Sequence, residues 1–104
     1  MEKNKYTIRY LPTFISQFNN ILYHITYELN NKIAANNLYK EVIYKIEERS
    51  FYPDSYKVFR KAKEKNINWY KIQVKRYTVF YVVKDNIMEV RRIYYSRRNF
   101  DKLI

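Results

Sequence analysis

Three short runs rich in β-branched and aromatic residues stand close together in the last third of the chain, within residues 69–98. Two polar pairs, Lys75-Arg76 and Asp85-Asn86, separate them and are short enough for tight turns. Runs of this composition, joined by such turns, are typical of adjacent antiparallel strands. The sequence therefore predicts a three-stranded meander, on which the rest of the chain has to pack.

The first two runs differ in the faces that they would bury. Residues 69–75 alternate apolar and polar side chains, so that Lys71, Gln73 and Lys75 would share one face of their strand. Residues 77–84 are apolar at both odd and even positions, which is typical of a strand at the centre of a sheet.

The last run, residues 87–95, contains two neighbouring arginines. Because successive side chains of a strand point to opposite faces, Arg91 and Arg92 would lie one on each face. The turn before this run, Asp85-Asn86, has the residue types that accept positive φ in a two-residue hairpin.

A fourth strand is predicted near the N-terminus, at residues 6–10, where apolar and polar side chains alternate. Leu11-Pro12 would end it, because proline has no backbone donor for a strand ladder. Thr13 is then the expected N-cap of a helix.

Two amphipathic helices follow, separated by Asn30-Asn31, since asparagine tolerates the left-handed conformation that ends a helix. The second helix would stop near Ser50. The expected buried stripes are Phe14, Phe18, Ile21, Leu22, Ile25 and Leu29 in the first helix and Ala35, Leu38, Val42 and Ile46 in the second. So short a joint predicts an antiparallel helical hairpin.

The order β-α-α-β-β-β predicts a single α+β domain over residues 1–104, with the helical hairpin packed on one face of a mostly antiparallel four-stranded sheet. Residues 54–68 lack a clear period and are expected to form a surface connection, and residues 96–104 a basic tail. The opposite face of the sheet would remain available to a partner.

Charge is unevenly distributed along the chain. Residues 1–56 carry seven basic and six acidic side chains, whereas residues 57–104 carry fourteen basic and four acidic ones. The formal net charge of +11 and this segregation indicate an acidic partner, either nucleic acid or an acidic protein.

Several classes of protein are disfavoured by composition. The chain has no cysteine, so disulfides and thiolate zinc sites are excluded, and His24 as its one histidine makes a metal site improbable. A mean hydropathy of -0.66 with no long uncharged run indicates no membrane span, and residues 1–10 do not resemble a signal peptide. We expect a cytoplasmic protein without a cofactor.

Several segments occur in a distinctive order. Tyr70-Lys71 opens a strand, residues 77–81 (YTVFY) follow the turn, and residues 92–100 (RIYYSRRNF) end the last strand. Together with the helical hairpin and its F-Y-P exit at residues 51–53, this order resembles the toxins of the RelE/ParE superfamily from type II toxin–antitoxin modules. The resemblance covers nearly the whole chain.

The resemblance implies a toxin that is neutralised by a cognate antitoxin through an acidic, mostly helical segment. The ending YSRRNFDKLI is closest to the ParE-like branch, which is associated with DNA gyrase, although Tyr95 stands where many members of that branch carry histidine. The residues expected to contact a partner or phosphate are Lys71, Gln73, Lys75, Arg91, Tyr95, Arg97 and Arg98.

The alternative that the resemblance implies is a RelE-like, ribosome-dependent mRNA endoribonuclease. The sequence departs from that branch, because Thr78 replaces its usual arginine, Gln73 replaces its second strand lysine, and the C-terminal tyrosine or histidine of some members is not evident. A third alternative is a degenerate toxin that only binds antitoxin. In the nuclease, the residues in contact with the scissile phosphate would be Lys71, Arg76, Arg92 and Arg98.

Overall fold

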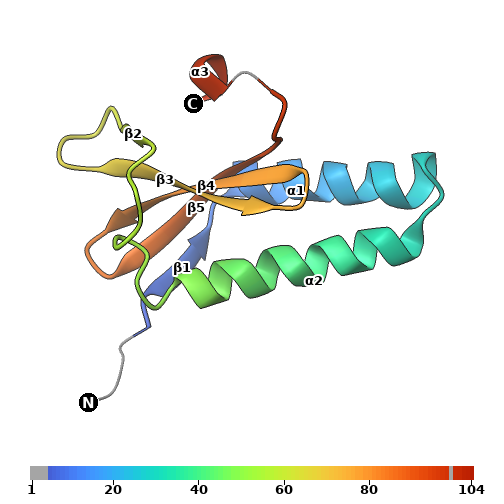
Figure 1. The fold of residues 1–104 in the computed structure, drawn as a ribbon, viewed down its shortest axis with the longest axis horizontal. Helices are drawn as coiled ribbons and strands as arrows, with labels where there is room; N and C mark the ends of the chain where they lie inside the picture. Colours follow the sequence, from blue (N-terminus) through green and yellow to red (C-terminus); the bar gives the residue numbers. More distant parts are fainter. Residues whose placement is uncertain (1–4, 99) are drawn as a thin grey trace.

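The computed structural model describes residues 5–98 and 100–104, which form an α+β fold with one five-stranded sheet (Figure 1). The strand order is β1-β5-β4-β3-β2, and every neighbouring pair is antiparallel except β1 and β5. The predicted class and helix–sheet order are confirmed. The elements are β1 (Thr7–Tyr10), α1 (Pro12–Tyr23), the π-helix η1 (His24–Glu28), α2 (Lys32–Arg49), β2 (Arg60–Lys61), β3 (Asn68–Val74), β4 (Tyr77–Lys84), β5 (Ile87–Tyr95) and α3 (Phe100–Leu103).

The strand β2 is the fifth strand that the sequence did not indicate. It lies within the segment 54–68, which was expected to be a surface connection, and it pairs Arg60 with Trp69 and Lys61 with Asn68. Two basic residues are too few to show an alternating pattern. The prediction of four strands was therefore wrong at this edge of the sheet.

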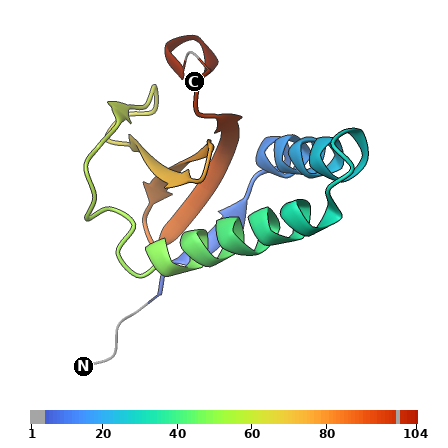
Figure 2. The ribbon, with the colours of Figure 1, turned by 45° about the vertical axis from the view of Figure 1, so that its right-hand side comes forward.

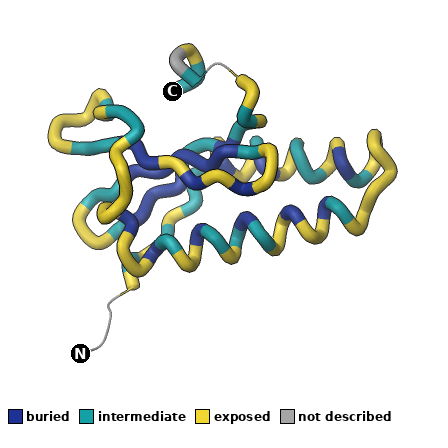
Figure 3. The backbone as a smooth tube through the Cα atoms, in the orientation of Figure 1, coloured by how far each residue is buried: buried dark blue, intermediate teal, exposed yellow. Residues whose placement is uncertain are grey.

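Both long helices lie along one face of the sheet, which we call the helix-covered face (Figures 1 and 2). The central strand β4 behaves as predicted, because Val79 and Tyr81 point to this face and Phe80 and Val82 point away from it. Buried residues are concentrated in the central strands and on the inner sides of the helices (Figure 3). The main core consists of Phe14, Phe18, Ile25, Ala35, Leu38, Val42, Ile46, Tyr70, Ile72, Val74, Val79, Tyr81, Met88, Val90 and Ile93.

The start of α1 differs from the prediction by two residues. Leu11 is extended, with φ -75° and ψ 151°, and the helix begins at Pro12 rather than after a Thr13 cap. Proline suits this first position because its ring fixes a helical φ and its missing donor would have had no partner there.

The end of the first helix also departs from its predicted stripe. After Tyr23 the chain continues as the π-helix η1, and Leu29, which was expected to be buried, is 59% exposed. A π-helix has more residues per turn, so the stripe rotates away from the core. The joint itself was predicted correctly, because Asn30 has a φ of 50° and the Asn31 side chain accepts a hydrogen bond from the Ala34 N–H.

The chain contains no glycine, and in the part that the structure describes four other residues take up the positive φ that the turns require. Asp85, in the turn before β5, has a φ of 54°, as predicted for that hairpin. Lys75 in the β3–β4 turn and Asn66 before β3 adopt the same region. The turns are thus built from residues for which this conformation costs free energy.

A β-bulge between β4 and β5 corrects the predicted positions of two arginines. Phe80 pairs with Arg92, whereas Tyr81 pairs with Val90, so Arg91 is an extra residue. Val90 and Ile93 both point into the main core, which leaves Arg91 and Arg92 on the same side of the sheet. The prediction of one arginine on each face was wrong because a bulge interrupts the alternation.

The other side of the sheet, which we call the opposite face, is partly covered. A second cluster is formed by Trp69, Phe80 and Val82. Side chains from the β2 region and from the C-terminal segment pack on it: Phe59, Ala62, Ile67, Tyr94, Phe100 and Ile104. The opposite face was expected to be open and residues 96–104 to be a tail, and both predictions were wrong over this part of the sheet.

The C-terminal segment is anchored by its aromatic ring and by backbone carbonyls. The ring of Phe100 lies 4.9 Å from that of Phe80, and the Ile104 carbonyl accepts a hydrogen bond of 3.0 Å from Arg60. The Tyr94 hydroxyl donates to the Leu103 carbonyl at 3.3 Å.

Candidate functional site

The predicted site residues of β3 lie on the opposite face, on the part that α3 and β2 leave exposed. Lys71 is exposed, and its Nζ lies 5.0 Å from the centre of the Phe59 ring. Gln73 is also exposed, but its side chain is held by other residues of the protein.

A neutral hydrogen-bond network links Gln73, Thr78 and Ser96. The Gln73 amide donates to the Lys75 carbonyl at 2.8 Å and to the Ser96 hydroxyl at 2.7 Å, and it accepts from the Thr78 hydroxyl at 3.0 Å. Thr78 and Ser96 also share a hydrogen bond of 2.9 Å. Because Thr78 is 1% exposed, this position is a packed structural element rather than a free surface group.

The β3–β4 turn holds the next two predicted residues. Lys75 forms an ion pair of 3.5 Å with Glu41 of α2. The Arg76 carbonyl accepts a hydrogen bond from the Ser96 N–H, and its side chain is exposed at the turn. Arg76 therefore lies at the end of the sheet, next to the neutral network.

Arg91 is part of an ion-pair network with Glu64 and Glu89. Its guanidinium lies 2.9 Å from Glu64 and 2.8 Å from Glu89, and over the Trp69 ring at 5.2 Å. A hydrogen bond from its own backbone, followed by that from Arg91, lowers the pKa of the Glu64 carboxyl. With only 11% of its side chain exposed, Arg91 ties the β2–β3 segment to β5.

The remaining predicted residues cluster near the end of β5. Arg92 is half-buried and donates to the Arg91 carbonyl, whereas Arg97 and Arg98 are exposed. The Arg98 guanidinium lies 5.6 Å from the centre of the Tyr94 ring. Tyr95 is exposed and packs edge-on against Tyr77, on the helix-covered side.

Five cations of the predicted site thus fall into two groups. Lys71, Arg92 and Arg98 lie on or beside the opposite face, where their positive charges are available to a partner. Lys75 and Arg91 are paired with carboxylates of the protein, as described above.

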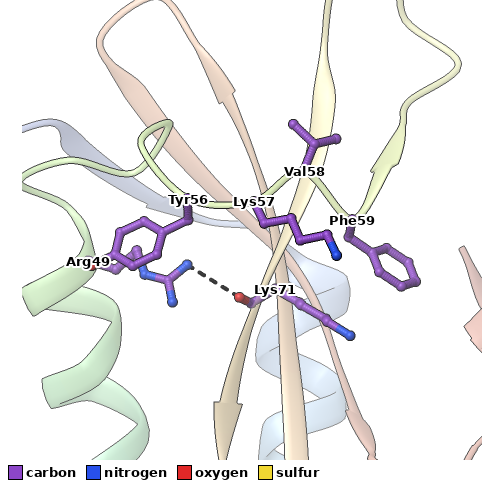
Figure 4. A pocket seen from close by; sticks show the side chains of 6 residues that line it. All are labelled: Arg49, Tyr56, Lys57, Val58, Phe59 and Lys71. Carbon is purple, nitrogen blue, oxygen red and sulfur yellow. Dashed lines mark hydrogen bonds between the residues drawn. The ribbon is translucent and has the colours of Figure 1, made fainter.

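A hollow of about 320 Å³ at the edge of β3 brings together residues that the sequence did not connect (Figure 4). It is lined by Arg49, Tyr56, Lys57, Val58, Phe59 and Lys71. Arg49 comes from the last turn of α2 and Lys71 from β3, and the other four belong to the segment that was expected to be a surface connection. The one available signal was the mixture of aromatic and basic residues in YKVFRK, at residues 56–61.

Arg49 is fixed in this hollow by the sheet. Its Nη1 donates to the Lys71 carbonyl at 3.2 Å and to the Tyr81 hydroxyl at 2.8 Å, and its guanidinium stacks 3.5 Å from the centre of the Tyr56 ring (Figure 4). The Tyr81 hydroxyl in turn donates to the Pro53 carbonyl. Burial raises the pKa of Tyr81 to about 12, although Arg49 acts in the opposite direction.

Neither a metal centre nor a membrane span is found in the part of the chain that the structure describes. No group of three or more histidine, cysteine, aspartate or glutamate side chains lies close enough together to hold a metal ion. None of the described helices combines the length and the apolar character needed to cross a bilayer.

Comparison with known proteins identifies a matching family and solved structures with a similar fold. The family described as "ParE toxin of type II toxin-antitoxin system, parDE" matches residues 8–100. No curated protein sequence matches this one significantly.

Two solved structures share the fold at low sequence identity. A chain of the chromosomal ParDE TA system from P. aeruginosa is similar with a TM-score of 0.68 and 10% identity, over 88% of this chain and 96% of the other. A chain of the archaeal RelE-RelB complex from Pyrococcus horikoshii OT3 is similar with a TM-score of 0.62 and 12% identity, over 92% of this chain and 100% of the other.

Proposed function

Because the chain belongs to the ParE toxin family of type II toxin–antitoxin systems, we propose that it arrests growth by acting on DNA gyrase and is neutralised by a cognate antitoxin in the cytoplasm. The antitoxin would contribute an acidic segment, which complements the fourteen basic residues in the second half of this chain. One related solved structure is named as a ParDE TA system and the other as a RelE-RelB complex, which supports a partner of this kind.

The observation that carries the choice of gyrase is the neutral network of Gln73, Thr78 and Ser96. By the resemblance, a nuclease of the RelE type would carry a lysine at position 73 and an arginine at position 78 to stabilise the charge of the phosphate in its transition state. Here the hydrogen-bonding groups of all three side chains are used within the protein. The network therefore favours a protein that acts by binding a target.

The second candidate function, mRNA cleavage on the ribosome, is favoured by the arginines at the end of β5. Arg92 is on the opposite face with Lys71, and Arg98 lies over Tyr94 at the border of that face. These cations could hold a phosphate group. A third candidate, a degenerate toxin that only binds antitoxin, would use the same surface without any activity.

The experiment that separates these functions is induction of the chain alone in a bacterial host. Growth arrest with inhibition of gyrase supercoiling by the purified protein, and with no new mRNA 5′ ends, is the expected result. New 5′ ends inside translated frames that disappear in Arg98→Ala would establish the nuclease instead. No growth arrest at all would leave the degenerate toxin, which only binds antitoxin, as the remaining candidate.

The reading frame beside this gene offers a separate test of the antitoxin contact. Its product should bind the chain, and Arg98→Glu should weaken that binding in calorimetry, by about tenfold for one charge reversal at a hydrogen-bonded pair. Unchanged affinity would place Arg98 outside the interface.

A further inference from the structure

We propose that the hollow at the edge of β3 binds an acidic peptide segment, whose carboxylate is held by Arg49, Lys57 and Lys71. An apolar side chain next to that carboxylate would lie against Tyr56. The inference rests on the proposed function in one respect, because the antitoxin is the natural source of such a segment.

Cations dominate the polar lining of the hollow. Arg49, Lys57 and Lys71 are three of its six lining residues, and none of the six is acidic. Within the described residues, no ion pair joins any of these three cations to a carboxylate, whereas Lys75 and Lys84 are paired with Glu41 and Glu89. The positive charge of the hollow is therefore available to a partner.

Arg49 is positioned before any ligand arrives. One nitrogen, Nη1, makes both of its hydrogen bonds to the protein, to the Lys71 carbonyl and the Tyr81 hydroxyl. No described residue accepts a hydrogen bond from its Nε or Nη2, and stacking on Tyr56 restricts the side chain. A guanidinium held in this way loses little conformational entropy on binding, and its two donors match the two oxygens of a carboxylate.

The aromatic rings of the hollow favour a peptide over a nucleic acid. Arg49 covers one face of Tyr56, and Lys71 lies over Phe59, whose ring also packs against Phe80 and Phe100. Nucleic-acid sites instead present ring faces on which bases stack. The rings here act as apolar walls beside the cations, which suits an aliphatic side chain flanked by carboxylates.

The edge of β3 explains why the hollow exists. β2 pairs with only Trp69 and Asn68, so β3 has no strand neighbour on this side from Lys71 onward. The Lys71 and Gln73 carbonyls are taken instead by Arg49 and, at 3.5 Å, by Lys45. Two cations of α2 thus cover the strand edge and leave space where a longer β2 would lie.

The test uses the full chain and a synthetic peptide with a leucine between glutamates. Lys57→Glu is the main variant, because Lys57 is exposed and makes no ion pair within the described residues. The matched control is Lys63→Glu, an equal change of charge at an exposed site in the same segment but outside the hollow. Binding is followed by NMR titration of the backbone amides, and an oligouridylate of equal charge is the competing probe.

We expect the peptide to shift the amides of residues 56–59 and 71, and Lys57→Glu to weaken binding about fivefold, whereas Lys63→Glu weakens it less than about twofold. Arg49→Lys, which keeps the charge but not the fork of donors, should also weaken binding. Equal losses in Lys57→Glu and Lys63→Glu would overturn the site in favour of general attraction to a basic surface. Tighter binding of the oligouridylate at the same amides would make the hollow a nucleic-acid site.

These outcomes are independent of whether the chain is toxic. A peptide that binds in the hollow while the induced chain fails to arrest growth would remove the proposed activity and keep the site. Growth arrest without peptide binding would keep the proposed activity and remove the proposed site.

Discussion

The two faces of the sheet are packed by different means. The helix-covered face is buried under two long helices, and its side chains form a continuous core that includes Val42, Val74 and Met88, none of which has measurable exposure. On the opposite face, the buried apolar cluster among the described residues consists of Trp69, Phe80 and Val82, which lie under side chains of the β2 region and of the C-terminal segment. Stability is thus concentrated on one face, whereas the exposed cations of Lys71 and Arg98 are found on or beside the other.

Because packing is concentrated on the helix-covered face, a substitution there should cause the largest loss of stability. Ile46→Ala should lower the free energy of unfolding by about 4 kcal/mol, because Ile46 is fully buried between α2 and the sheet and its loss leaves a cavity. Urea denaturation measures this. Tyr44→Ala on the same helix, at a side chain that is 64% exposed, is the control and should change it by less than about 0.5 kcal/mol. Similar losses in both variants would contradict this division.

On the opposite face the largest effect should come from an ion pair. Arg91→Ala should cost about 2 kcal/mol, because it leaves the buried Glu89 with only its longer ion pairs to Arg9 and Lys84, at 3.7 Å and 3.9 Å. Arg97→Ala removes an equal charge from an exposed position and should be nearly neutral. If Arg91→Ala is equally neutral in urea denaturation, the network does not stabilise the fold.

Alkaline pH should weaken the helix-covered face first. Burial raises the pKa of Tyr10 and of Tyr81 to about 12, so above the unfolded value of 10.0 the unfolded chain loses phenolic protons that the folded chain keeps. The free energy of unfolding should therefore fall as the pH rises from about 10 to about 12, by about 2 kcal/mol for Tyr81. Tyr81→Phe should reduce the slope of stability against pH in that range. An unchanged slope would exclude Tyr81 as its cause.

The smallest effect is expected from the C-terminal cover of the opposite face. Phe100→Ala should lower the free energy of unfolding by about 1 kcal/mol, because the ring is only partly buried against Phe80. Hydrogen exchange should increase for the α3 amides and stay unchanged in β4. An increase in both would mean that the two faces unfold as one unit.

The sequence predicted the helix-covered face well. All four residues of the expected stripe in the second helix, Ala35, Leu38, Val42 and Ile46, are buried, and β4 is the central strand. A periodic pattern over a long helix or strand indicates directly which residues are buried, because the core positions recur at the spacing of that helix or strand.

The opposite face was harder to predict because it is built from short segments. A two-residue strand and a four-residue helix contain no full period, and a bulge reverses the alternation that placed Arg91 and Arg92. Of the candidate site, the exposed positions of Lys71 and Arg98 followed from the sequence. The participation of Arg49 did not, because its contact with Lys71 joins residues 22 positions apart through the end of a helix and the edge of a strand.

The parallel pairing of β1 with β5 has a consequence for how the chain folds. Thr7 lies beside Ile87, so the first strand can take its place only after β5 has been synthesised. Until then the apolar stripes of the helical hairpin have no sheet to cover. Contacts so distant in sequence close a large loop, which slows folding and leaves the stripes exposed to other proteins in the meantime. The newly made helical hairpin therefore exposes apolar side chains, such as those of Val42 and Ile46, that are fully buried in the folded protein.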